Sequence, residues 1–285
     1  MIRKALYLLA MMAVTGTSWA QAPSPSGPRD HDIYCAGGFT NTPPPSDTYV
    51  ITGQESDVRI VFRQGDLVYI NRGSKQGVQA GNEFLVSRPV KDRSTAQWFV
   101  WQKDLMRSMG QAYADVGRLR VVHVDDNTST AQIVLFCDQM QRGDIVVPFT
   151  ARQVPNYKPE SKFDVFAPAS GKNMAMVVAM RDFAQVGRNG SVIYVNLGAT
   201  QGVHVGDYFR IFRYQGDHHT NMFKTRDQER AVYGFGAAPA TWNWANLPRE
   251  VLGEGLVVNV SPNSSSVLVT DSLREVFTGD YVEVE

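Results

Sequence analysis

The sequence predicts an all-β protein built from two tandem small β-barrel domains, which follow a cleaved signal peptide. One stretch, GDLVYINRGSKQGVQAGNEFLVSR at residues 65–88, returns as GSVIYVNLGATQGVHVGDYFRIFR at residues 190–213. Short β-branched and aromatic runs alternate with polar turns along most of the chain. No stretch of the chain shows a sustained helical stripe. Together these patterns indicate duplicated β-domains and exclude a helical bundle.

The first residues have the three parts of a secretory signal. Arg3 and Lys4 precede the apolar run ALYLLAMMAV, and TGTSWA then ends in small residues at Ala20. The apolar run is too short for a permanent transmembrane helix. We expect residues 1–20 to be a signal peptide that is cleaved after Ala20, with Gln21 as the mature N-terminus. The alternative is a buried N-terminal helix.

Residues 21–47 are predicted to form a proline-rich leader. QAPSPSGPRDHD and NTPPPSD are typical of exposed, extended chain, and Cys35 lies between them. In an exported protein, two cysteines favour a disulfide, so we expect Cys35 to pair with Cys137 and to tether the leader to the first domain. Two buried free thiols are the alternative, and nothing near either cysteine indicates a catalytic partner.

The body of the chain divides into a first barrel at 48–150, a linker at 151–163 and a second barrel at 164–285. Each opening motif is followed by a second shared block, GRLRVVHVDDNTSTAQIVLFCDQMQRGDIVVPF at 117–149 and GEGLVVNVSPNSSSVLVTDSLREVFTGDYVEVE at 253–285. The alternating runs in these blocks predict strands, and VDDNTST and SPNSSS predict hairpin turns. The best helix candidate is residues 103–116, which Gly110 weakens.

The glycines of the opening motif are interpreted as turn residues. Gly73 and Gly198 follow a strand and are expected to need a positive φ. Two further pairs are expected to bracket a tight loop that leads into an inward-facing phenylalanine, Phe84 or Phe209; these pairs are Gly77 with Gly81, and Gly202 with Gly206. A phosphate-binding loop would need a helix after its glycines, whereas a strand is predicted here.

Both blocks together resemble a known family. VYINRGSKQGVQAGNEFLVSR and IYVNLGATQGVHVGDYFRIFR, each followed by a VV strand, a polar hairpin and a GD turn, resemble the C-terminal β-domain of flagellar assembly protein T. Related exported bacterial modules, sometimes found with LysM domains, share the pattern. The resemblance covers about 65–149 and 190–285 and implies a small β-barrel used in envelope assembly, with no catalytic residues to carry over. This chain differs in carrying two tandem copies.

Charge and motifs leave few candidates for chemistry. The chain has 28 basic and 28 acidic residues, and loss of Arg3 and Lys4 with the signal would leave 26 against 28, so nucleic acid is not an expected partner. His218 and His219 are adjacent in a loop and do not have the spacing of a zinc site. The RGD at 142–144 aligns with TGD at 278–280 and is interpreted as a repeat turn. We therefore expect no enzyme activity, no cofactor and no metal.

The most plausible contact residues lie where the two copies differ. The insert at 89–116 carries Trp98 and Trp101, and the insert at 214–252 carries Trp242 and Trp244. Such rings can stack on sugars or anchor a protein interface, or they can simply pack one domain on the other. The sequence thus favours a non-enzymatic structural or assembly protein of the cell envelope, periplasmic or secreted, with a protein partner and without a transmembrane segment after signal cleavage. The alternative is a peptidoglycan- or carbohydrate-binding protein that uses the tryptophan inserts.

Overall fold

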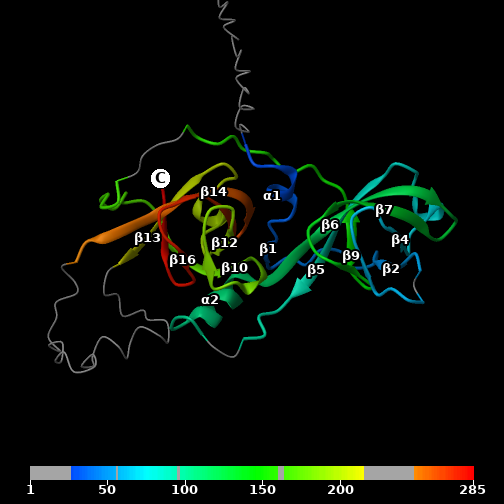
Figure 1. Ribbon diagram of the computed structural model, residues 1–285, viewed down its shortest axis with the longest axis horizontal. Helices are drawn as coiled ribbons and strands as arrows, with labels where there is room; N and C mark the ends of the chain where they lie inside the picture. The colour runs from blue at the N-terminus through cyan, green and yellow to red at the C-terminus, as the bar shows by residue number, and fades with distance from the viewer. Residues whose placement is uncertain (1–26, 56, 95–96, 160–163, 215–246) are drawn as a thin grey trace, which may run out of the picture.

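The computed structural model describes residues 27–55, 57–94, 97–159, 164–214 and 247–285, so the predicted signal peptide lies outside the described residues. Figure 1 shows two β-bodies beside each other, with the N-terminal helix α1 between them. Strands dominate both bodies and the helices are short, which confirms the predicted all-β class.

The first body is a twisted sheet of six main strands. Its order is β2-β4-β7-β6-β5-β9, and β1 (Gly38–Thr40) is added at the side of β6. The six strands are β2 (Val50–Gly53), β4 (Leu67–Ile70), β5 (Glu83–Val90), β6 (Gln111–Val124), β7 (Ser129–Phe136) and β9 (Ile145–Pro148). A bridge from Tyr49 to Ile145 and backbone hydrogen bonds from Val50 to Asp144 and from Val146 to Thr48 join the two edge strands, so we call this body the first barrel. A short pair, β3 (Val61–Phe62) with β8 (Met140–Gln141), lies beside the sheet.

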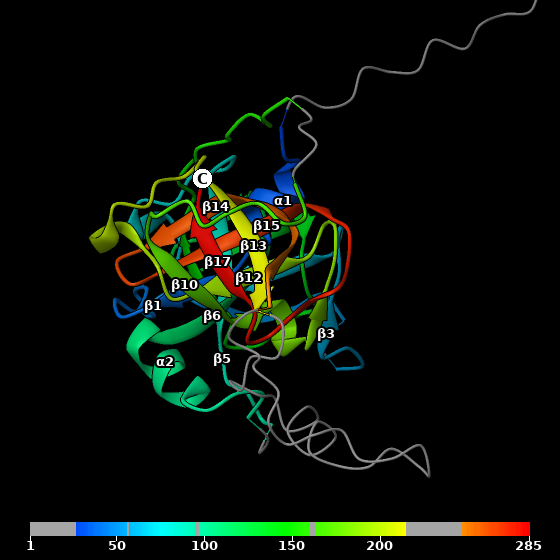
Figure 2. The same cartoon turned by 90° about the vertical axis from the view of Figure 1, so that its left-hand side faces the viewer.

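The second body is a closed barrel with the corresponding order, β10-β12-β15-β14-β13-β17. Figure 2 faces this side of the molecule. The strands are β10 (Met174–Met180), β12 (Val192–Val195), β13 (Tyr208–Tyr214), β14 (Arg249–Ser261), β15 (Ser264–Ser272) and β17 (Tyr281–Val284), and the side pair is β11 (Val186–Gly187) with β16 (Val276–Phe277). The shared strand order is the three-dimensional form of the repeat seen in the sequence.

Each barrel has its own apolar core. Phe84 is 6% exposed within the first and Phe209 is fully buried within the second, as expected from their place after the glycine loop. Alternation along the strands sends these side chains inward and their neighbours outward. The motif phenylalanines are therefore structural.

The helices differ from the sequence-based expectation at one boundary. The helix expected at 103–116 is α2 (Gln102–Met109), and β6 begins two residues after it. Gly110 ends the helix with φ 105°, a left-handed conformation that glycine adopts without steric cost. The other helices are α1 (Asp30–Tyr34) and the 3₁₀ turns η1 (Ser74–Gln76), η2 (Arg181–Phe183) and η3 (Ala199–Gln201).

The leader at 21–47 also differs from the exposed chain that its composition suggested. Residues 30–40 form α1 and β1, and Ile33, Tyr34 and Phe39 are buried in a cluster that includes side chains of both barrels. Strand β1 pairs with β6 of the first barrel. We call residues 29–40 the wedge, because they fill the space between the two barrels.

Hydrogen bonds attach the wedge to the second barrel. The Tyr194 hydroxyl donates to the carbonyl of Ala36 at 2.8 Å, and the Ser266 hydroxyl donates to the carbonyl of Gly37 at 2.8 Å. Ser264 donates in the same way to Phe39, at 3.0 Å. The buried carbonyls of the wedge are thus satisfied by side chains from β12 and β15.

The predicted linker is held against the protein over its described part. Arg152 makes a bidentate ion pair with Asp115 of β6, at 2.8 and 2.9 Å. Lys158 pairs with Glu254 and Glu285 of the second barrel, and its ammonium lies 4.6 Å from the centre of the Tyr208 ring. Burial lowers the pKa of Lys158, but the two carboxylates outweigh it, and the net pKa lies above its usual value.

Candidate binding surface

The first insert is fixed to the second barrel by one buried glutamine. Gln102 is 4% exposed; its Oε1 accepts the Trp98 backbone N–H at 2.8 Å, and its Nε2 donates to the carbonyl of Val178 in β10 at 3.0 Å. The neighbouring Phe99 is buried against Gly279, where a Cβ would lie 3.2 Å from the Phe99 ring. The insert of one repeat therefore packs on the barrel of the other.

Two apolar side chains next to this anchor face outward. Val100 is 55% exposed and Trp101 is 59% exposed. Trp101 stands before α2 with φ 72°, a left-handed conformation that is uncommon for an aromatic residue. Such a conformation persists only where the surrounding structure holds it. Here the buried Phe99 precedes Trp101 and the hydrogen-bonded Gln102 follows it, so the backbone is fixed on both sides. The fold thus fixes the position of an exposed tryptophan.

A groove of 470 Å³ lies beside α2. Its apolar lining comes from Phe39, Val90, Met106, Ala112 and Phe183. Its polar lining includes three cations and one carboxylate, from Lys91, Lys103, Arg107 and Asp92. We call this groove, together with Val100 and Trp101, the insert surface.

Only part of the contact set predicted from the sequence, the four tryptophans of the two inserts, is found at the insert surface. Trp98 is half-buried near the anchor and Trp101 is exposed, so the two rings of the first insert have different surroundings. Trp242 and Trp244 lie outside the described residues. Sequence reasoning missed Phe99 and Gln102, although QWFVWQ contains both, because nothing in the sequence alone shows that Gln102 bonds a carbonyl of the other repeat.

The predicted disulfide and glycine turns have structural roles. Cys35 and Cys137 form a disulfide, which ties the wedge to the segment after β7. Gly77 and Gly202 have φ 82° and 84° and end η1 and η3. The same positive φ holds at the second glycine of each loop, Gly81 and Gly206.

The expectation of a positive φ at Gly73 and Gly198 is wrong. Their φ values are −136° and −143°, which is extended backbone. Glycine is needed there for another reason, because a Cβ would lie 2.4 Å from the carbonyl oxygen of Asp125 or 2.3 Å from that of Ser261. The β-hairpin turn of each repeat crosses directly over these positions.

Both copies contain a buried ion pair that sequence reasoning missed. Arg88 binds Asp144 through two hydrogen bonds, at 2.7 and 2.8 Å, and Arg213 binds Asp280 at 2.6 and 2.7 Å. The aspartates are 3% and 4% exposed. The hydrogen bond to Asp144 raises the pKa of Arg88 and outweighs burial. The signal was present, because both residues are shared between the repeats.

This pair also explains the RGD sequence. Asp144 is the acidic residue of that motif, and its carboxylate is held inside the protein by Arg88 and by the backbone N–H of Gln141. It is not presented at the surface as an adhesion motif would require. The interpretation of RGD as a repeat turn agrees with this geometry.

A second buried ion pair belongs to the second barrel alone. Arg249 donates to both oxygens of Glu283, at 2.6 and 2.9 Å, and its guanidinium lies 4.4 Å from the centre of the Phe212 ring. Burial raises the pKa of Glu283, but hydrogen bonds from Arg249 and from the Ser170 backbone N–H outweigh it and leave the pKa below its usual value. The pair lies on the outer side of the barrel wall, where the carbonyls of Ala167 and Pro168 also accept hydrogen bonds from Arg249.

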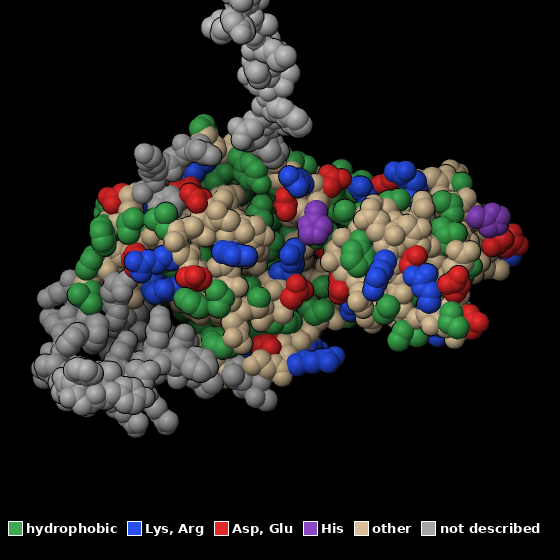
Figure 3. Space-filling view, viewed as in Figure 1, with side chains coloured by type: hydrophobic (Ala, Val, Ile, Leu, Met, Phe, Trp, Pro, Cys, Tyr) green, Lys and Arg blue, Asp and Glu red, His purple; other side chains and the backbone are tan. Residues whose placement is uncertain are grey.

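The other candidates for chemistry do not gather into a site. His123 and His204 are both exposed, on β6 and in the glycine loop of the second barrel, and His31 is exposed in α1. His218 and His219 lie outside the described residues. Lys and Arg alternate with Asp and Glu over the face drawn in Figure 3, without a field of one sign.

The chain was compared with known protein families and with curated proteins. No family model matches the chain, and no curated protein matches it either. Among the described residues, no helix has the length and apolar character needed to cross a bilayer. The disulfide is compatible with a location outside the cytoplasm.

Proposed function

We propose that the protein is a non-enzymatic structural or assembly protein of the cell envelope, exported to the periplasm or beyond, which binds a protein partner through the insert surface. The observation that carries the proposal is the fixed, exposed pair Val100 and Trp101, which directly precedes the helix α2 whose residues line an apolar groove. Aromatic side chains held in place by their neighbours are common anchors of protein interfaces.

The joined barrels support this role. The wedge, the linker and the first insert each contact both barrels, so the protein presents its surfaces at a fixed separation. A scaffold needs that rigidity, because a partner then binds without the cost of ordering two domains. The resemblance of both repeats to the C-terminal domain of flagellar assembly protein T points to the same class of envelope role.

Site-specific photocrosslinking in the native host tests the proposal. A photoreactive residue in place of Trp101 is expected to give one discrete adduct with an envelope protein. The same residue in place of Val122, which is 48% exposed on the first barrel, serves as the control and should give no such adduct. Equal adducts from both positions, or none from position 101, would contradict the proposal.

The rival function is binding to peptidoglycan, for which the exposed ring of Trp101 is the supporting observation. Retention of the purified protein on isolated sacculi, lost in Trp101→Ala and in Trp242→Ala/Trp244→Ala, would favour the rival. Absence of retention would remove it. Export is tested separately by the intact mass of the mature protein, which should begin at Gln21.

A further inference from the structure

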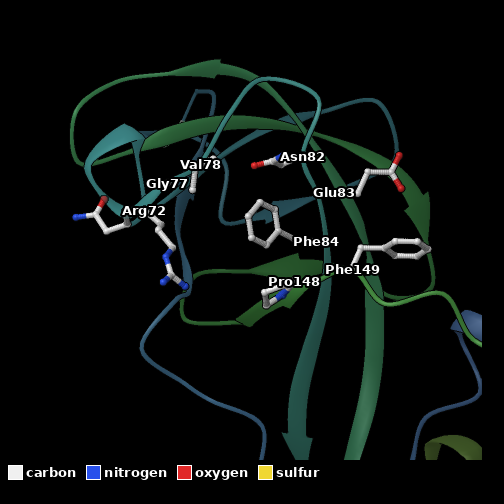
Figure 4. A pocket seen from close by; sticks show the side chains of 9 residues that line it. Arg72, Gly77, Val78, Asn82, Glu83, Phe84, Pro148 and Phe149 are labelled. Atoms are coloured by element: carbon white, nitrogen blue, oxygen red, sulfur yellow. The ribbon is translucent and has the colours of Figure 1, made fainter.

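The mouth of the first barrel contains a groove that the insert surface does not include. It has a volume of 610 Å³ and lies between η1 and the end of β9. In Figure 4 the Phe84 ring stands between Val78 and Pro148, with Arg72 on one side and Glu83 and Phe149 on the other. Val78 and Phe84 belong to the barrel core, so the groove reaches down to the core at its centre.

The second barrel shows what occupies the place that corresponds to this groove. The two barrels align through identical bonds, since the Val50 N–H donates to the Asp144 carbonyl and the Val177 N–H donates to the Asp280 carbonyl. In the second barrel, residues 170–173 turn at Gly171, which has φ 74°, and pass the place that corresponds to the groove. The Val284 N–H donates to the Asn173 carbonyl at 3.1 Å.

Side chains of that segment bind the same walls. The Asn173 amide donates to the carbonyl of Gln201 at 3.0 Å, and the Ser170 hydroxyl donates to the carbonyl of Val284 at 3.1 Å. Gln201 and Val284 correspond to Gln76 and Pro148, which line the groove of the first barrel. The second barrel is therefore covered by its own chain at the place where the first is open.

Proline explains why the first barrel stays open. Pro148 replaces Val284 and has no N–H, so β9 cannot make the bond that continues the ladder in the second barrel. The segment that would cover it contains Pro43, Pro44 and Pro45, where the second copy has Ser170, Gly171 and Lys172. The edge strands of the first barrel are accordingly joined by the Tyr49–Ile145 bridge and the backbone hydrogen bonds around it, which stop short of Pro148, whereas the ladder of the second barrel continues to Val284.

The groove of the first barrel also has a different charge. Glu285, which binds Lys158 in the second barrel, is replaced by Phe149, and the buried Leu197 is replaced by Arg72. Arg72 donates to the Thr48 hydroxyl at 3.2 Å and lies 4.0 Å from the exposed carboxylate of Asp47. The groove of the first barrel is thus mainly apolar, with Arg72 at one side and Glu83 at the other as its charged lining.

We infer that this groove binds a short peptide segment of a partner protein, with an apolar side chain over Phe84 and Pro148 and a carboxylate at Arg72. The segment lies along the end of β9 as residues 170–173 lie along β17, and it needs no donor from Pro148. The inference goes beyond the proposed function, because the insert surface does not contribute to it.

Selection from a library of short random peptides displayed on phage tests the inference, with the mature protein as the target. Peptides that combine an acidic and an apolar residue are expected to be enriched. Synthesised and titrated by calorimetry, they should bind Arg72→Glu about tenfold or more weakly than the unmodified protein, because the ion pair becomes a repulsion. Pro148→Arg should abolish binding by filling the groove.

Matched controls use exposed positions outside the groove. Lys75→Glu makes the same charge change as Arg72→Glu on the neighbouring turn, and Thr150→Arg matches Pro148→Arg. Both controls and Trp101→Ala should bind the peptides as the unmodified protein does, and thermal unfolding verifies that each variant folds. The inference is overturned if no peptide is enriched, if the enriched peptides bind all variants equally, or if Pro148→Arg dissociates a dimer of this chain.

Discussion

Removal of the disulfide should both destabilise the protein and release the wedge. The perturbation is the double variant Cys35→Ala/Cys137→Ala, which leaves no free thiol. The two cysteines are 102 residues apart in sequence, and loop-closure entropy for a ring of that size corresponds to about 4.7 kcal/mol at 25 °C. A typical domain has only about 5–15 kcal/mol of stability, so the loss should be large.

Urea unfolding, followed by tryptophan fluorescence, measures the free energy of unfolding. The double variant should lose about 4–5 kcal/mol, and reduced wild-type protein should behave in the same way. Tyr194→Phe is the matched control, because it removes one hydrogen bond between wedge and second barrel while the disulfide remains. It should cost about 1–3 kcal/mol, since the buried carbonyl of Ala36 is left without its donor.

Hydrogen exchange of the wedge separates the two consequences of disulfide loss. Amide protons of α1 and β1 should exchange much faster in the double variant, while those of β14 and β15 should change only with global stability. A loss of less than about 1 kcal/mol, or unchanged protection in residues 29–40, would refute the reasoning. The wedge would then be held by its apolar contacts and its hydrogen bonds to the second barrel, without a contribution from the disulfide.

Three further outcomes are expected. Arg213→Met should cost about 3–5 kcal/mol in urea unfolding, because it leaves the carboxylate of Asp280 buried without its partner, and Asp280→Asn in the same chain should recover part of the loss. Gly198→Ala should cost about 1–3 kcal/mol through its clash with backbone, and more than Gly202→Ala, which has open space and only an unfavourable φ; equal costs would contradict the close-approach argument. Glu283 has a folded pKa below its ordinary 4.5, so its stabilising effect is complete above pH 4.5 and is lost as the pH falls through the folded pKa; the destabilisation by Glu283→Gln should therefore be large at pH 7 and shrink in acid, and a pH-independent effect would argue against it.

The strands and the duplication could be predicted because both depend on patterns within short stretches of the sequence. Alternation with period two marks each strand, and the repeat shows that both halves have the same order of strands. The phenylalanines of the glycine loop, Phe84 and Phe209, face their cores for the same local reason. The disulfide followed from the number of cysteines and the predicted export.

The wedge could not be predicted in the same way. Its neighbours in the sequence are rich in proline and serine, and the partners that bury Tyr34 and Phe39 come from strands far along the chain. The anchor Gln102 also depends on a carbonyl of the other repeat, Val178. Pro148, which leaves the first barrel open at this end, can be seen in the sequence. Its effect can be recognised only when the register of β9 is known.

The wedge has a consequence for the order of events during biosynthesis. Its hydrogen-bond partners Tyr194, Ser264 and Ser266 lie 158 to 229 residues further along the chain. The first part of the folded protein to leave the ribosome is therefore the last to find all its contacts, since contacts of such separation form late and slowly. The disulfide between Cys35 and Cys137 lies within the first half of the chain, so in an oxidising environment it can hold the wedge beside the first barrel before these partners are made.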